Sequence, residues 1–145
     1  MRKEARIRTD TATIVLFDPL RLESRKNDVC DWWTGDGDLD IEEAAANLVF
    51  VDTGIDGVFE VAVTTVRATG DGQLVKSTVI EVPSGELLFG AGEHLPGEGT
   101  WRSQRLTPHS VERGTYRVGV CLPKTELKGG TALYVFVLEL LKQTA

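Results

Sequence analysis

Apolar and polar residues alternate along much of this chain with a period of two. In residues 59–63 the side chains of Phe59, Val61 and Val63 fall on one face, and residues 116–122 repeat the pattern. This alternation is typical of a β-strand that buries one face. Short, β-branched segments predict further strands at 11–17, 48–52, 74–82, 86–90 and 132–141. The last segment is apolar on both faces, which indicates a central strand covered on both sides.

Turn-forming residues separate these segments, at 54–57, 70–72, 83–85 and 128–130. Glycine tolerates a positive φ angle and proline presets a turn, so each of these stretches favours a chain reversal. A chain of 145 residues is most simply one domain with one core. We therefore predict a single-domain, all-β, antiparallel β-sandwich or barrel of about seven or eight strands over residues 1–145.

One short helix is predicted at residues 40–47. Asp40 is a good N-cap, and Glu43 stands three positions later, as a capping box requires. The alanines at 44–46 favour a helix before the next strand begins.

The charge is distributed unevenly. The formal net charge is −6, yet residues 27–66 contain ten acids and no Lys or Arg, so this segment carries −10 and the rest carries +4. A nucleic-acid binder would show a basic stripe instead, so that class is disfavoured. A one-signed field raises the rate of encounter with a basic protein, although a solvated face that only confers solubility explains the same pattern.

The densest part of this segment is DWWTGDGDLDIEE (31–43). Adjacent residues on an extended backbone point in opposite directions, so we expect one tryptophan in the core and the other exposed or partly covered. An exposed tryptophan beside acids would be a good interface anchor. The candidate partner-binding residues are Asp31, Trp32, Trp33, Asp36, Asp38, Asp40, Glu42 and Glu43.

Catalytic and metal-binding motifs are weak. An EF-hand that starts at Asp36 would need glycine where Ile41 stands, so the acids do not predict a calcium site. The glycine-rich loop at 90–99, with Glu93, His94 and Glu98, is the alternative: a small-ligand site or a metal-dependent β-barrel enzyme. The chain has only two histidines, fifteen residues apart, so an incidental surface loop is favoured. We predict no enzyme, no catalytic residue, no metal and no cofactor.

Two cysteines lie far apart in the chain, Cys30 and Cys121. They permit one disulfide, but free thiols in a reducing cytoplasm are the better interpretation. No apolar run is long enough to span a bilayer, and the N-terminal stretch lacks the features of a secretory signal. The sequence therefore predicts a cytoplasmic protein without a membrane partner and leaves the oligomeric state open.

The order of segments resembles the competence protein J family of bacteria. The likeness extends over residues 11–141 and rests on TIVLFD, DWW, LVFVDTGIDGVFEVAV, STVIEVPSGELLFG, RGTYRVGVCLP and LYVFVLEL, with Asp31, Trp32, Gly114, Tyr116 and Pro123. That family is associated with inhibition of a nuclease that acts in DNA uptake, and similar small domains serve as immunity proteins against secreted toxins. The resemblance implies an inhibitor or immunity protein that blocks a basic nuclease or other toxin, because carboxylates can occupy the place of phosphates in a cationic cleft.

Overall fold

Two β-sheets packed face to face form the protein. The computed structural model describes residues 2–35, 37–98, 105–122 and 132–144. Sheet A contains five strands in the order β1 (Arg2–Thr9), β4 (Gly57–Thr64), β9 (Leu133–Gln143), β8 (Gly114–Leu122) and β5 (Gln73–Val82). Sheet B contains four strands in the order β3 (Val49–Asp52), β2 (Thr13–Phe17), β6 (Glu86–Ala91) and β7 (Thr107–Ser110). The described strands do not close into a barrel, so the predicted β-sandwich is confirmed.

The main core lies between the two sheets. The inward-facing residues of β4, β8 and β9 meet those of β2 and β6, as the alternation in the sequence predicts. Phe59 and Tyr134 make an edge-to-face ring contact, with centroids 5.3 Å apart. Phe89 and Phe136 are fully buried. Burial of such aromatic side chains is a dominant favourable term in the stability of a sandwich.

The strand count and the pairing differ from the prediction in two ways. The described residues form nine strands, because β1 and β7 were not predicted. Both are edge strands: β1 is rich in Arg and Lys, and β7 contains Pro108, which are features that edge strands tolerate. The pair β4–β9 is parallel, whereas the other pairs are antiparallel. The central position predicted for 132–141 is confirmed, since β9 lies between β4 and β8.

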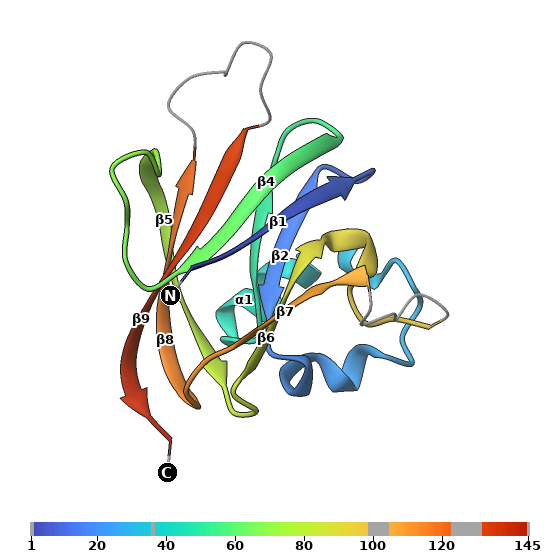
Figure 1. Cartoon of the computed structure of the whole chain (residues 1–145). Coiled ribbons are helices and arrows are strands. Elements are labelled where there is room, and N and C mark those ends of the chain that lie inside the picture. The colour runs from blue at the N-terminus through green and yellow to red at the C-terminus, as the bar shows by residue number, and fades with distance from the viewer. Residues whose placement is uncertain (1, 36, 99–104, 123–131, 145) are drawn as a thin grey trace.

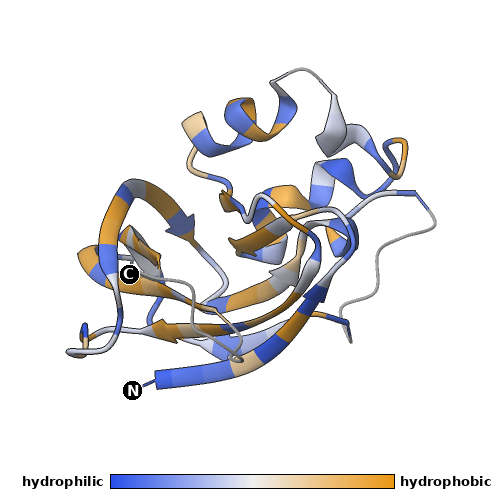
Figure 2. Cartoon of the chain, turned by 90° about the horizontal axis from the view of Figure 1, so that it is seen from above, coloured by the Kyte–Doolittle hydropathy of each residue, from blue (hydrophilic) through white to orange (hydrophobic). Residues whose placement is uncertain are grey.

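Short helices cover the outer face of sheet B. They are η1 (Pro19–Arg25), η2 (Trp32–Thr34), α1 (Asp38–Ala44) and η3 (Gly92–His94). Figure 1 shows them on the side of sheet B that faces away from sheet A, and Figure 2 shows the same layering from above. A second apolar cluster lies beneath them, built from Val15, Phe17, Leu22, Trp32, Trp33, Leu48, Leu88, Leu95 and Leu106. This layer positions the acidic stretch 31–43 on the surface.

Candidate functional site

Both tryptophans of the acidic stretch belong to the apolar layer beneath the helices. Trp32 is 8% exposed and Trp33 is 9% exposed. The indole Nε1 of Trp32 donates a hydrogen bond to the carbonyl oxygen of Pro96 at 2.7 Å. The expectation that one of the two is exposed is wrong, because η2 is a helical turn and not the extended backbone on which neighbours point in opposite directions.

The helix after the tryptophans begins earlier than predicted. α1 covers Asp38–Ala44, and its N-cap is Gly37 with φ of +82°, a conformation that glycine adopts without strain. Asp40 is therefore not the cap; Asp38 and Asp40 both lie in the first turn, where acids suit the positive end of the helix. Asp36 lies outside the described residues.

Arg25, at the end of η1, lies among three carboxylates. Its guanidinium is 3.2 Å from Asp28, 3.6 Å from Asp38 and 3.2 Å from Glu42, measured between the nearest nitrogen and oxygen atoms. It also stacks over the ring of Trp32, 4.2 Å from the ring centroid. The segment 27–66 contains no cation of its own, yet the fold brings this one in from just outside it and so neutralises part of the acidic charge.

The two glutamates of the stretch have structural partners. Glu42 is buried, and it accepts hydrogen bonds from Arg25 and from the side-chain amide of Asn47. Glu43 forms an ion pair with Lys76 of β5 at 2.8 Å and accepts from the backbone N–H of Phe50 at 3.4 Å. Glu42 therefore ties α1 to η1 and to Asn47, and Glu43 anchors α1 to β5 and β3.

The described aspartates of the stretch, with two acids from outside it, form the acidic surface, which we define as Asp28, Asp31, Asp38, Asp40 and Glu98. Asp31 and Asp40 are exposed, and no ion pair to either is found in the part of the chain that the structure describes. Asp28, Asp31, Asp38 and Glu98 line an open depression of about 640 Å³ beside Arg25. The backbone N–H of Glu98 donates to the carbonyl of Asp28 at 2.7 Å, which holds the two sides together.

Two exposed apolar residues accompany these acids and were missed in the sequence. Val29 is 66% exposed and lines the depression, and Ile41 on α1 is 59% exposed. For Ile41 the sequence holds a signal, because a β-branched residue directly between two acids, Asp40 and Glu42, is poorly placed to enter the core; Val29, which is followed by Cys30, carries no such signal.

The glycine-rich loop has a structural role at Glu93. This carboxylate accepts hydrogen bonds from the hydroxyls of Thr9 and Thr11 and from the backbone N–H of Asp10, at 2.6 to 3.0 Å. Burial alone would raise the pKa of Glu93, but these hydrogen bonds outweigh it and hold the pKa below its ordinary value. His94 and Glu98 do not join it in a cluster. Within the described ranges, no three His, Cys, Asp or Glu side chains could together hold a metal ion.

The cysteines are free thiols, with Cys30 exposed and Cys121 buried. Burial raises the pKa of the Cys121 thiol. No helix in the described part of the chain is long and apolar enough to cross a membrane.

The protein is thus an all-β sandwich of two sheets, with short helices and an acidic surface over the outer face of sheet B. The chain belongs to the family described as "Family of unknown function (DUF6386)", whose profile matches residues 1–127. No curated protein sequence matches it.

Two solved structures share the fold. One is entitled "Crocagin biosynthetic gene J", with a TM-score of 0.58, 18% identity, and coverage of 94% of this chain and 96% of the other. The second is ComJ from Bacillus subtilis, described as an inhibitor of the DNA-degrading activity of NucA. It gives a TM-score of 0.59 at 11% identity, with 96% of each chain covered. At such identities the likeness concerns the fold, and it bears out the resemblance found in the sequence.

Proposed function

We propose that this protein is an acidic inhibitor that binds and blocks a basic protein partner, a bacterial nuclease or other toxin, and that it has no catalysis of its own. The observation that carries the proposal is the acidic surface, where Asp31 and Asp40 are exposed and form no ion pair with any described residue, while Asp38, Glu42 and Glu43 are paired with Arg25 or Lys76. A carboxylate array can occupy the phosphate positions of a cationic cleft. The fold shared with ComJ supports a nuclease as the kind of partner.

The contact surface in this proposal is smaller than the stretch 31–43. Asp31 and Asp40 supply the charge, Asp38 beside them is partly balanced by Arg25, and Val29 and Ile41 supply apolar contacts. Trp32, Trp33, Glu42 and Glu43 hold this surface in place, since their side chains are buried or ion-paired. An interface with apolar anchors and charged surroundings is the usual arrangement in protein–protein recognition.

The test is capture followed by inhibition. The immobilised protein is exposed to cell extract and culture medium of its source organism, bound protein is eluted with salt, and it is identified by mass spectrometry. We expect a basic protein whose DNA-degrading or toxic activity falls stoichiometrically when the purified inhibitor is added. A captured protein whose activity is unchanged by saturating amounts, or the absence of any salt-eluted partner, contradicts the proposal.

A further inference from the structure

Among the described residues, β9 has a free edge over its last six residues. Its parallel pairing with β4 ends at Thr64 and Val137, because the chain then leaves the sheet through Thr65. β9 continues to Gln143, still paired with β8 on its other side. In the described ranges, no strand pairs with residues 138–143 on the β4 side. The backbone groups that point to this side are available to another strand.

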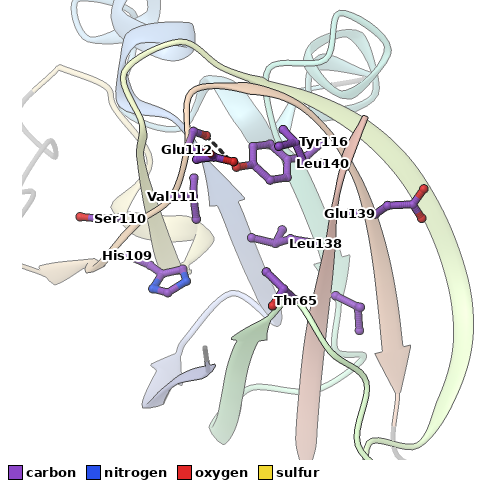
Figure 3. A pocket seen from close by; sticks show the side chains of 10 residues that line it. Thr65, His109, Ser110, Val111, Glu112, Tyr116, Leu138, Glu139 and Leu140 are labelled. Carbon is purple, nitrogen blue, oxygen red and sulfur yellow. Dashed lines mark hydrogen bonds between the residues drawn. The ribbon is translucent and has the colours of Figure 1, made fainter. Parts of the chain in front are cut away.

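The free edge is apolar and lies beside a cavity. Leu140 is 38% exposed and Leu141 is 42% exposed. A cavity of about 550 Å³ is lined by four consecutive residues of β9, from Val137 to Leu140, together with Tyr116 and Val111. Figure 3 shows Leu138 on the cavity side and Glu139 pointing away from it. Consecutive residues line the cavity because the strand presents its edge to it.

Sheet A has two outer edge strands, β1 and β5, and β1 differs from the free edge of β9 in its charge. β1 carries Arg2, Lys3, Arg6 and Arg8, and like charges along an edge disfavour pairing with another copy of itself. The free edge of β9 reads Leu-Glu-Leu-Leu-Lys-Gln and carries one charge of each sign. A register shift in its pairing with β8 and the charge of Lys142 disfavour edge pairing in general, whereas the two opposite charges favour an antiparallel second copy.

This six-residue sequence is complementary to itself when run antiparallel. A two-fold axis between Leu140 and Leu141 pairs residue 138 with 143, 139 with 142 and 140 with 141. Glu139 of each copy is then opposite Lys142 of the other, and the exposed leucines meet. A two-fold interface of this kind repeats each contact twice.

The two charged residues also share a face, which direct pairing requires. Residues three apart on a regular strand point in opposite directions. In β9 a register shift against Thr115 and Tyr116 inserts one extra residue, so Glu139 is opposite Arg117 and Lys142 is opposite Thr115. Arg117 and Thr115 are two apart on β8, so Glu139 and Lys142 lie on the same side of sheet A. The ion pair of Arg117 with Glu139 at 3.2 Å would extend to Lys142 of the second copy.

We propose that two copies of this protein associate by antiparallel pairing of residues 138–143 of β9, which makes one continuous sheet across the dimer. The inference does not depend on the acidic surface, which lies over sheet B. An interface of six paired residues with two leucines on each side is small, and association in roughly the micromolar to millimolar range is expected.

The test uses two charge reversals and their mixture in sedimentation equilibrium. In Glu139→Lys alone, the introduced lysine of each copy is opposite the native Lys142 of the other. In Lys142→Glu alone, the introduced glutamate of each copy is opposite the native Glu139 of the other. Each variant should self-associate at least about tenfold more weakly than the wild type, because attraction becomes repulsion in two symmetric pairs.

Mixing the two variants should restore the attraction. The lysine introduced at position 139 of the first variant then faces the glutamate introduced at position 142 of the second. At the other contact, the native Lys142 of the first variant faces the native Glu139 of the second. Both contacts join opposite charges, so the heterodimer should form with near wild-type affinity.

Glu60→Lys is the matched control. Glu60 is also a surface acid of sheet A that pairs with an arginine on the neighbouring strand, Arg6, but it lies away from the free edge. Its self-association should equal that of the wild type. A wild type that stays monomeric up to about millimolar concentration, single variants that dimerise normally, or a mixture that does not recover association would each overturn the proposal.

Discussion

Carboxylates from one short stretch of this chain lie in opposite environments. Glu42 and Glu43 face inward and are held by Arg25, Asn47 and Lys76. Asp31 and Asp40, a few residues earlier, face solvent. The charge counted along a sequence therefore exceeds the charge at the surface, because the fold brings cations to some acids and leaves others exposed to solvent.

We call the inward-facing carboxylates Glu42 and Glu43 the inner group. Their support depends first on Trp32, because Arg25, the partner of Glu42, stacks on its ring. Trp32→Ala removes a buried ring that Arg25 stacks on and that hydrogen-bonds to Pro96, so the free energy of unfolding should fall by about 3–5 kcal/mol. Urea denaturation measures this change. Val29→Ala, at an exposed neighbouring position, should change the same quantity by less than about 0.5 kcal/mol. Equal effects of the two substitutions would mean that Trp32 is not a core residue.

Substitutions at Arg25 and Lys26 compare a cation held among three carboxylates with an exposed cation that has one partner. Arg25→Ala leaves Asp28, Asp38 and Glu42 close together without their cation, and a loss of about 2–3 kcal/mol in the free energy of unfolding is expected. Lys26 makes a single exposed pair with Glu23, so Lys26→Ala should cost less than about 0.5 kcal/mol. Thermal and urea unfolding of both variants measure the two losses in the free energy of unfolding. Similar losses would show that Arg25 does not organise the inner group.

Glu93, in the glycine-rich loop, is another carboxylate that is held by internal hydrogen bonds, and its contribution to the free energy of unfolding depends on pH. Its folded pKa lies below the ordinary value of 4.5, so its contribution to stability is full above that value and is lost as the pH falls through the folded pKa. Glu93→Gln should lower the free energy of unfolding by about 1 kcal/mol at pH 7, and this difference from the wild type should disappear in acid. Urea unfolding of both proteins from pH 7 down into acid measures this difference in the free energy of unfolding. A difference that grows in acid would contradict the structural role of Glu93.

The sequence predicted the sandwich because alternation and turn residues are local signals, and the strands at 11–17, 48–52, 74–82, 86–90, 116–122 and 132–141 all have counterparts. It did not predict β1, whose many charged residues leave only Ala5 and Ile7 as apolar positions. It also could not reveal that Arg25 and Lys76 reach the acids, since both lie outside the segment 27–66 in the chain. Pairings of this kind depend on which strands and helices meet in three dimensions.

The central claim is that the exposed carboxylates Asp31 and Asp40, the outer group, attract the basic partner. The measurement that tests it most directly is the association rate with the captured partner at two salt concentrations. Asp31→Asn with Asp40→Asn removes two exposed charges and should change the free energy of unfolding by less than about 0.5 kcal/mol. Asp56→Asn with Glu86→Gln removes two exposed charges elsewhere and is the matched control.

We predict that the first pair of substitutions slows association several-fold at low salt, that the difference shrinks at high salt because exposed charges are screened, and that the control keeps the wild-type rate. An association rate of the folded Asp31→Asn, Asp40→Asn variant equal to that of the wild type at low salt would contradict the account.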